Sequence, residues 1–368
     1  MASPTTFGLI RERLIRERRV ALTPAGAEQL IAAGHIVLLE NSAGDDAGFS
    51  DDDYRAVGAN VFMSAREVIQ ASEVFVKLHV PNTEELEWLR EGGTLTGFLH
   101  LFSESETRLR EIIREQKMNA VSFELLEENA NYRPVLEAVS AIGGRVAILL
   151  ATQHMLGSAG GIGRLLGGAP GVPPLGVVVI GAGAAGEAAA REAHRMGARV
   201  SVLDQNPRAL ARISRRLPGV TTAPASGPVL DDAIANADLL LCAVAMPGRP
   251  APRIVNRRQV RSMPQGAMII DMSVDEGGCC ETTRPSADEG IYIEEGVRHL
   301  CVPNLPAEVA RTASTAFTNS ILPYLLAMGN MGIQEAVGTE PALYKAAVYI
   351  EGRLRNSTIA ELTGEPLG

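Results

Sequence analysis

Short apolar runs alternate with longer stretches that are apolar on one side only along the first third of the chain. The runs predict strands, and the one-sided stretches predict helices. Pro24 and Gly34 bracket one of these stretches, as a proline in the first turn and a glycine just past the last turn of a helix do. Strands are expected at residues 7–10, 35–40, 74–80, 94–100 and 119–123, and helices at residues 24–33, 51–57, 64–71 and 104–115. This order predicts a parallel sheet with helices on its faces.

The alternation of strands and helices continues through the rest of the chain. A long helical stretch at residues 134–156 leads into a segment rich in glycine and proline, and residues 312–328 predict another long helix. Further strands are expected at residues 177–180, 238–243, 268–271 and 291–293. The pattern therefore predicts α/β structure on both sides of the glycine-rich segment.

The most informative motif is a glycine-rich turn within residues 177–204, which read VVVIGAGAAGEAAAREAHRMGARVSVLD. Gly181 allows a tight turn out of the first strand, and Gly183 removes a side chain that would hold the backbone away from a pyrophosphate. Gly186 lets the following helix pack closely on the sheet. The motif predicts a dinucleotide-binding Rossmann unit, and the alternative is a glycine-rich turn in an ordinary strand–helix unit.

The residues after the turn indicate which dinucleotide binds. Ala184 and Ala185 open the helix, whose N-terminal N–H groups and dipole favour phosphates. Asp204 ends the second strand, where a carboxylate accepts hydrogen bonds from ribose hydroxyls and repels a 2′-phosphate. Arg208 opposes this preference for NAD over NADP unless it belongs to a solvated helix face with Arg212, Arg215 and Arg216. NAD is the predicted cofactor.

Length and patterning together predict two domains. A chain of 368 residues and 39.0 kDa exceeds one ordinary core. We predict an α/β protein with two Rossmann-like domains, in which an NAD-binding domain (135–312) is inserted into a discontinuous substrate domain (1–134 and 313–368). Ligands of such sheets bind at the carboxyl ends of the strands, so the active site is expected in a cleft between the domains.

Composition narrows the class of protein. A hydrophobic content of 46% with 21% charged residues is typical of a soluble globular protein, and a net charge of −9 argues against nucleic acid as a partner. The N-terminus has no apolar core of a signal peptide, and the most apolar runs, 146–150 and 321–326, are too short to span a membrane. The four cysteines show neither a zinc-site nor a disulfide spacing. A cytoplasmic enzyme without a metal or a membrane partner is expected.

Several side chains at expected strand ends are suited to chemistry. Arg19 lies in a strand-to-helix loop, where a guanidinium can bind a carboxylate through two hydrogen bonds. His100 ends an apolar run and has a near-neutral pKa that suits proton transfer, and Asp275 follows a buried strand in a glycine-bearing loop. Lys77 and His79 are two residues apart on an expected strand, so they would share one face and suit an anionic substrate.

Each of these assignments has a structural alternative. Arg19 stands among many arginines that face solvent, and His100 can be a structural histidine. Asp271, before Asp275, can be a strand-end carboxylate satisfied by local donors. The pair of basic residues on strand 74–80 can belong to a solvated edge strand.

Taken in order, these segments resemble the alanine dehydrogenase family, which is related to the nucleotide-binding subunit of transhydrogenase. The similarity covers nearly the whole chain. It is carried by residues 19–26 (RVALTPAG), 98–101 (FLHL), 167–174 (GGAPGVPP), 181–186 (GAGAAG), 243–248 (AVAMPG), 274–285 (VDEGGCCETTRP), 301–306 (CVPNLP) and 318–324 (TNSILPY). The resemblance implies NAD and a homo-oligomer, a hexamer or a dimer.

The resemblance also implies site residues. Arg19 falls at the family's carboxylate-binding arginine, His100 at its active-site histidine and Asp275 at its active-site aspartate. Asn304 falls at an asparagine near the nicotinamide and the substrate. The cofactor contacts fall at Asp275 and at Ser140, Gly181, Gly183, Ala184, Ala185, Gly186, Asp204, Ala243 and Val244.

One departure from the family pattern concerns the substrate. The family typically has Lys-Val-Lys-Glu-Pro, whose second lysine helps to hold the substrate carboxylate, whereas here Lys77 is followed by Leu78, His79, Val80 and Pro81. An imidazole is shorter than a lysine and largely neutral near pH 7. Val139 also stands where the family usually has methionine. The substrate pocket is therefore expected to be remodelled, and the substrate is expected to differ from simple alanine.

Three functions fit these observations. The first is an NAD-dependent oxidoreductase acting at the amine-bearing carbon of a small amino acid or at the corresponding keto acid. The second is reductive joining of an amino acid to a keto acid, as in carboxyethyl-ornithine synthases. This reaction needs room for a larger amine, and His79 is shorter than the lysine that the family has at this position. The third is a dinucleotide-binding protein or a transhydrogenase-like subunit without a substrate of its own, which the presence of Arg19, His100 and Asp275 disfavours.

Overall fold

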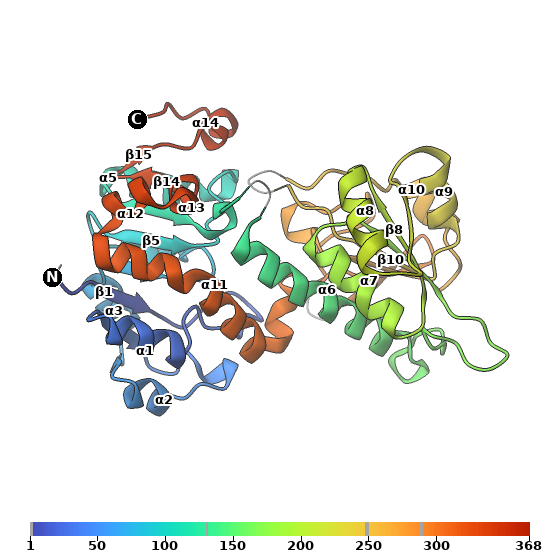
Figure 1. Cartoon of the computed structure of the whole chain (residues 1–368), viewed down its shortest axis with the longest axis horizontal. Helices are drawn as coiled ribbons and strands as arrows, with labels where there is room; N and C mark the ends of the chain where they lie inside the picture. The colour runs from blue at the N-terminus through green and yellow to red at the C-terminus, as the bar shows by residue number, and fades with distance from the viewer. Residues whose placement is uncertain (1–2, 130–131, 247–249, 287–289) are drawn as a thin grey trace. The chain divides into compact units, whose positions relative to one another are not determined.

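The computed structural model describes residues 3–129, 132–246, 250–286 and 290–368. The chain divides into two compact units, which we call unit 1 (Met1–Val139 with Ala307–Gly368) and unit 2 (Ser140–Pro306). The domain boundaries expected from the sequence fall at 134/135 and 312/313. Figure 1 shows a sheet with helices in each unit.

Unit 1 is built on an eight-stranded sheet of order β15-β14-β6-β5-β4-β1-β2-β3. Strands β1 to β6 are parallel to one another, whereas β14 pairs with β6 and β15 with β14 in antiparallel fashion. The strands are β1 (Thr6–Leu9), β2 (Ile36–Glu40), β3 (Asn60–Phe62), β4 (Val74–Val76), β5 (Thr94–Gly97), β6 (Asn119–Ser122), β14 (Ala347–Ile350) and β15 (Arg353–Leu354).

Helices cover both faces of the unit 1 sheet, because the strand residues that point to either face are apolar. Phe7 and Leu9 belong to a core with α1 and α11, and Phe75 and Leu95 belong to a second core with α3 and α5. The helices of this unit are α1 (Pro24–Ala32), α2 (Asp51–Ala56), α3 (Ala65–Ala71), α4 (Thr83–Glu87), α5 (Thr107–Glu115), α11 (Ala310–Met331), α12 (Ile333–Thr339), α13 (Pro341–Ala346) and α14 (Ser357–Thr363), with 3₁₀ turns η1 (Asp45–Ala47), η2 (Glu104–Glu106) and η3 (Phe123–Leu125).

Unit 2 is built on a seven-stranded sheet of order β12-β13-β11-β10-β7-β8-β9. All neighbours are parallel except β12, which pairs with β13 in antiparallel fashion. The strands are β7 (Gly176–Ile180), β8 (Arg199–Asp204), β9 (Thr221–Pro224), β10 (Leu239–Cys242), β11 (Met268–Asp271), β12 (Ile291–Glu294) and β13 (Val297–Leu300).

The unit 2 sheet also carries helices on both faces. Val178, Leu240 and Ile269 pack with side chains of α9 and α10 in one core, and α7 packs along β7 and β8. The helices are α7 (Ala184–Arg195), α8 (Pro207–Arg216), α9 (Gly227–Ala235) and α10 (Arg257–Ser262), with 3₁₀ turns η4 (Gly157–Ala159) and η5 (Val274–Glu276). Helix α6 (Pro134–Met155) and the turn η6 (Leu305–Val309) run across the boundaries of the units.

The prediction of two Rossmann-like α/β sheets is confirmed, with three corrections. β4 ends at Val76 and β5 at Gly97, earlier than expected, and the apolar residues Leu78, Phe98 and Leu99 beyond these ends are buried. β4 is an interior strand between β1 and β5, so the alternative of a solvated edge strand is wrong. Antiparallel strands occupy one edge of each sheet, and β3, β9, β13, β14 and β15 are too short or too polar to read from an apolar run.

Helix α6 corrects the expectation about apolar stretches. By length and composition alone it could cross a membrane, with a mean hydropathy of 1.7 in its most apolar window, because alanines and glycines extend the short apolar runs. A core helix of a soluble protein passes the same test. Part of that window is buried, and a Cβ on Gly144 would lie 2.1 Å from the carbonyl oxygen of Ala185. The glycine therefore permits close packing of α6 against the first turn of α7.

Candidate active site

The same strand order recurs in the two sheets and locates a candidate site in each. Six strands of unit 1 run in the order β3-β2-β1-β4-β5-β6, and six of unit 2 in the order β9-β8-β7-β10-β11-β13. β1 lies between β2 and β4, and β7 lies between β8 and β10. The chain therefore continues toward one edge of the sheet after β1 or β7 and toward the other edge after β4 or β10. Such switch points at the carboxyl ends of strands form the ligand crevices of open α/β sheets.

The switch point of unit 2 carries the glycine-rich turn. Gly181 has φ of 104°, and a Cβ there would lie 2.3 Å from the carbonyl oxygen of Ala243 at the end of β10. A Cβ on Gly186 would lie 1.8 Å from the carbonyl oxygen of Gly181. A Cβ on Gly183 would meet nothing within 4 Å, so the fold does not require this glycine. The open space at Gly183 fits the close approach of a pyrophosphate, and Ala184 and Ala185 begin α7 beside it.

Asp204 holds the same turn from the end of β8. Its Oδ2 accepts a hydrogen bond from the backbone N–H of Ala182 at 2.6 Å, and its Oδ1 accepts one from Asn206 at 2.7 Å. Arg212 donates to the carbonyl oxygen of Ala182, so both backbone polar groups of this residue are hydrogen-bonded. A carboxylate oxygen has room for a second donor, and Asp204 is partly exposed, so these bonds leave it able to accept from a ribose hydroxyl.

The arginines of α8 are not simply a solvated face. Arg212 Nε and Arg216 Nη1 each lie 3.1 Å from the carboxylate of Glu187 on α7, and Arg191 reaches the same group at 2.7 Å. These cations lower the pKa of Glu187 although its partial burial opposes the change. The charges of Arg212 and Arg216 are therefore bound to α7.

The loop after β11 brings two of the expected site residues together. Asp275 lies in η5, and its Oδ2 accepts a hydrogen bond from the backbone N–H of Asn304 at 3.2 Å. The loop is anchored by Asp271, which is buried and accepts from the N–H groups of Ser273, Cys279 and Cys280 and from the hydroxyl of Thr283. The interpretation of Asp271 as a strand-end carboxylate with local donors is confirmed.

The remaining expected cofactor contacts lie around this turn and on α6. Ala243 follows β10 and donates its N–H to the carbonyl oxygen of Ile180. The carbonyl oxygen of Val244 accepts from the hydroxyl of Ser273 at 2.7 Å. Ser140 is partly exposed on α6. Of the family-like segment 243–248, Pro247 and Gly248 lie outside the described residues.

All four cysteines are buried free thiols within unit 2. Cys242 Sγ lies 3.5 Å from Cys280 Sγ, and Cys279 Sγ donates to Ser273 Oγ at 3.4 Å. Burial raises the pKa of the Cys279 and Cys301 thiols to about 12. The thiols therefore behave as small apolar groups in the core of this unit.

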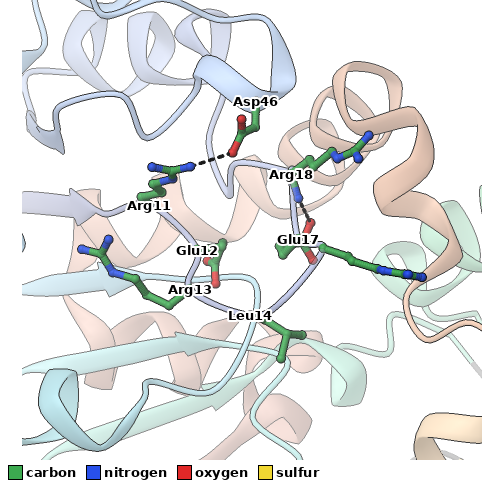
Figure 2. A pocket seen from close by; sticks show the side chains of 8 residues that line it. Arg11, Glu12, Arg13, Leu14, Glu17, Arg18 and Asp46 are labelled. Carbon is green, nitrogen blue, oxygen red and sulfur yellow. Dashed lines mark hydrogen bonds and ion pairs between the residues drawn. The ribbon is translucent and has the colours of Figure 1, made fainter. Parts of the chain in front are cut away.

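The switch point of unit 1 gathers charged side chains from the loops after β1 and β4. Figure 2 shows the first loop bent around Glu12 and Glu17, with Arg11 turned toward Asp46. Glu17 Oε1 accepts from Arg19 Nε at 2.9 Å, and Glu17 Oε2 accepts from Arg19 Nη2 at 2.7 Å. His79 Nε2, after β4, lies 2.6 Å from the same Oε2 and 3.3 Å from Arg19 Nη2. We call Glu17, Arg19 and His79 the arginine cluster.

The arginine cluster fixes the tautomer of His79. Burial of Glu17 tends to raise the pKa of its carboxyl, but the hydrogen bonds and charges of Arg19 and His79 outweigh it and hold that pKa far below its usual range. The ionised carboxylate can only accept, so His79 Nε2 must carry a proton and donate it to Glu17. The second ring nitrogen, Nδ1, makes no hydrogen bond to any described residue, and His79 is 22% exposed.

Lys77 and His79 border the same cavity, but the Lys77 ammonium is held by carboxylates. Both lie beyond the end of β4, and the Lys77 side chain is buried. Its Nζ donates to Glu85 Oε2 at 3.0 Å and lies 3.4 Å from Glu12 Oε2. Glu12 Oε1 in turn accepts from the N–H of Leu78 at 2.7 Å. Lys77 therefore joins the loops of the sheet, and its charge is balanced by two carboxylates.

His100 follows β5 in a left-handed backbone conformation, with φ of 43°. Its N–H donates to Glu124 Oε1 at 2.9 Å, after β6, and its ring packs edge-on against Phe102. Complete burial raises the pKa of the Glu124 carboxyl, and the charge of His100 opposes this only in part. Since β4, β5 and β6 are parallel neighbours, His79, His100 and Glu124 follow strands that end at one edge of the sheet.

Sequence reasoning missed the acids of this site. Glu17 and Glu124 are buried beside Arg19 and His100, and the sequence pattern singled out neither of them. Glu17 precedes Arg19 by two residues, and this spacing within an otherwise cationic loop was the available signal. Glu124 gives no local signal, because its partner lies 24 residues away.

Comparison with known proteins identifies the class. Residues 8–143 match the family model "Alanine dehydrogenase/PNT, N-terminal domain", and residues 147–357 match "Alanine dehydrogenase/PNT, C-terminal domain". The chain therefore belongs to the alanine dehydrogenase/PNT family. It is an NAD-dependent oxidoreductase of the amino-acid dehydrogenase type, as predicted.

Individual relatives agree with this assignment. An alanine dehydrogenase of Methanococcus maripaludis is 37% identical over 358 residues, which are 96% of this chain and 95% of the relative. A solved structure of L-alanine dehydrogenase is 34% identical, with a TM-score of 0.91 over 98% of this chain and 99% of that one. A transhydrogenase structure from Sinorhizobium meliloti, 24% identical with a TM-score of 0.81 over 95% of this chain and 99% of that one, shares the fold.

Proposed function

We propose that this protein oxidises the amine-bearing carbon of a small amino acid, or reduces the corresponding keto acid in the presence of ammonia, and that its best substrate is not simply alanine. The observation that carries the proposal is the arginine cluster at the switch point of unit 1. There His79 stands where a lysine would add a second positive charge beside Arg19. The charge of Arg19 itself is already balanced by Glu17. A site for alanine would gain from a second permanent cation.

Unit 1 supplies the substrate-binding groups in this proposal. Arg19 binds the substrate carboxylate and fixes the direction in which the α-carbon faces the cofactor. His100 moves the proton of the amine and of the attacking water as the imine forms and hydrolyses. Lys77 keeps the loops after β1 and β4 in register through Glu12 and Glu85. Lys77 therefore acts on the substrate by positioning His79.

Unit 2 supplies the cofactor-binding groups. Gly183, Ala184 and Ala185 would receive the pyrophosphate, and Asp204 the ribose hydroxyls. Ser140, Ala243, Val244 and the loop of Asp275 and Asn304 would border the nicotinamide end. When bound there, NAD would supply the hydride acceptor for oxidation of the amine-bearing carbon. The chain itself leaves space for the pyrophosphate at Gly183, which has no side chain, and holds the turn through Asp204. Asp275 would take up or release a proton.

A panel of amino acids with NAD, followed by absorbance of NADH, tests the proposal. Turnover on at least one small amino acid, with alanine below the best substrate, is the expected result. The reverse reaction is measured with keto acids and ammonia. Lack of turnover on every amino acid in both directions would overturn the proposal and favour a binding protein without a substrate.

A second candidate is the reductive joining of an amino acid to a keto acid. A cavity of about 520 Å³ opens beside His79, where a longer lysine would take up part of the space. This volume exceeds what the side chain of alanine needs. The candidate is tested by replacing ammonia with amino acids in the reductive assay and searching for a secondary-amine product by mass spectrometry.

The proposals about assembly and cellular location rest on the protein surface, the net charge and the thiols. A homo-oligomer, a hexamer or a dimer, is supported by an apolar hollow of unit 2 that exposes Leu149, Leu156, Leu165 and Met196. A cytoplasmic location is supported by the net charge of −9 and by the reduced thiols. Light scattering of the purified protein tests the first proposal, and cell fractionation tests the second.

A further inference from the structure

The cavity beside His79 is lined by acceptors that no described donor satisfies. It is bordered by the loop after β1, the segment from Lys77 to Leu86 and the start of α5. Besides His79 Nδ1, two buried carboxylate oxygens on its lining accept no hydrogen bond from any described residue, Glu12 Oε2 and Glu85 Oε1. The side chains of Glu12 and Glu85 are each 2% exposed. Solvent therefore satisfies these oxygens poorly, and buried acceptors without donors are costly.

The nearby cations do not remove this excess of acceptors. Lys77 Nζ is 3.4 Å from Glu12 Oε2 without hydrogen-bond geometry, and it donates to Glu85 through the other oxygen. Arg13 Nε is 3.6 Å from Glu85 Oε1, and this guanidinium donates to Glu40 at 2.6 Å. The two cations neutralise charge at a distance while the lone pairs of these oxygens stay unused.

His79 differs from a lysine in what it offers to the cavity. A lysine ammonium only donates, whereas His79 has its donor, Nε2–H, engaged by Glu17. In the neutral ring Nδ1 is therefore an acceptor. His79 connects Arg19 with the cavity, because its Nε2 lies 3.3 Å from Arg19 Nη2 and the same residue lines the cavity.

We propose, resting on the amino-acid dehydrogenase function above, that this cavity binds the substrate side chain and selects for a terminal N–H or O–H donor. His79 Nδ1 and the unused oxygens of Glu12 and Glu85 are the acceptors that would receive this donor. Hydroxyl, amide and ammonium groups share the required chemistry. An aliphatic end leaves the acceptors unsatisfied, and a carboxylate end adds a further acceptor to them.

The experiment compares kcat/KM for amino acids of similar length with NAD. Homoserine, glutamine and ornithine present a hydroxyl, an amide and an ammonium, and norvaline and glutamate present an aliphatic end and a carboxylate. At least one donor-bearing substrate is expected to exceed norvaline and glutamate by about tenfold or more. The ranking within the first group identifies which donor is recognised. If norvaline or glutamate is the best substrate, the inference is wrong while the proposed function stands. If alanine is the best substrate, the inference is wrong and so is the proposal that the substrate differs from alanine.

A pair of variants separates specificity from folding. His79→Gln keeps an N–H that can reach Glu17 but removes the Nδ1 acceptor, so the ratio of kcat/KM for the best donor substrate to norvaline is expected to fall about tenfold. His35→Gln is the matched control, since His35 is in the same unit and bonds Asn330 away from the cavity. It is expected to leave the ratio unchanged. An equal loss on both substrates in His79→Gln would indicate a structural role and would overturn the inference.

Absence of turnover on every substrate has a different meaning. That result contradicts the dehydrogenase function itself, and binding of the same amino acids by isothermal titration calorimetry then tests the cavity alone. Preferential binding of a donor-bearing amino acid that is lost in His79→Gln would support the acceptor-lined cavity. Equal binding of norvaline would overturn it.

Discussion

The two switch points are built from different parts of the chain. In unit 2 the atoms that define the site belong to the backbone: the carbonyl oxygens of Gly181 and Ala243 leave no room for a Cβ, and Asp204 accepts from the N–H of Ala182. In unit 1 the corresponding loops meet through charged side chains, Glu17 with Arg19 and His79. A backbone site tolerates little change in sequence, whereas a side-chain site can change its ligand by one substitution. The proposed change of substrate therefore lies in the side chains of unit 1, whereas NAD binding is expected to depend on the backbone of unit 2.

The largest expected effect tests whether each unit contributes to the chemical step. His100→Ala in unit 1 and Asp275→Ala in unit 2 should each lower kcat on the best substrate by roughly two to four orders of magnitude, because each removes a proton-transfer group. NADH binding, measured by fluorescence titration, should change little. A variant that keeps near-normal turnover would remove its residue from the proposed chemistry.

Glu17→Gln tests the side-chain site. Because the pKa of Glu17 is lowered in the folded state, its carboxylate stabilises the fold above the ordinary pKa of 4.5 and loses this effect as the pH falls toward the lowered value. Removing it leaves Arg19 without its buried acceptor charge, which costs about 3–5 kcal/mol. Urea unfolding at pH 7 should show this loss, and the difference from the unmodified protein should shrink in strong acid. A pH-independent difference would contradict the assignment.

Two glycine variants test the backbone site. Gly186→Ala should destabilise unit 2 by about 1–3 kcal/mol or more, because its Cβ would meet the carbonyl oxygen of Gly181. Gly183→Ala should leave the melting temperature nearly unchanged and weaken NADH binding, since the added methyl takes only space that the pyrophosphate would use. Thermal melts with and without NADH distinguish the two. Unchanged NADH affinity in Gly183→Ala would place the pyrophosphate elsewhere.

The smallest effect concerns cofactor choice. NAD should bind at least about tenfold more tightly than NADP, because the carboxylate of Asp204 would face the 2′-phosphate. Asp204→Ala should reduce this preference, and part of the NAD affinity should also be lost because the turn loses its bond to Ala182. Equal dissociation constants for the two cofactors in the unmodified protein would show that Arg208 or another cation overrides Asp204.

The sequence predicted the backbone site well and the side-chain site only in part. Gly181, Gly186 and Asp204 stand at a fixed spacing, and each has a local steric or hydrogen-bonding reason that can be read from the motif. The ion pairs of Lys77 could not be predicted, because its partners Glu12 and Glu85 lie in other segments of the folded unit. Such pairings are set by the order of strands in the sheet. Periodicity gives that order only after the strands have been paired.

The same limit explains the errors in the strands. The apolar runs extend beyond the last residues of β4 and β5, because Leu78, Phe98 and Leu99 are buried and Phe98 still donates its N–H to the carbonyl oxygen of Leu78. An apolar pattern reports burial and does not mark the residue at which a regular strand ends. β14 directly follows helix α13 and β15 has two residues, so neither stands out as a separate alternating run.

The distribution of thiols gives the protein a built-in reporter of motion. Cys242, Cys279, Cys280 and Cys301 are all buried in unit 2, and unit 1 contains no cysteine. A thiol reagent in solution can therefore react only when unit 2 opens locally or as a whole, and the rate of alkylation measures the free energy of that opening. No engineered label is needed. Slower alkylation with added NADH would measure how much the bound cofactor raises the free energy of opening of unit 2.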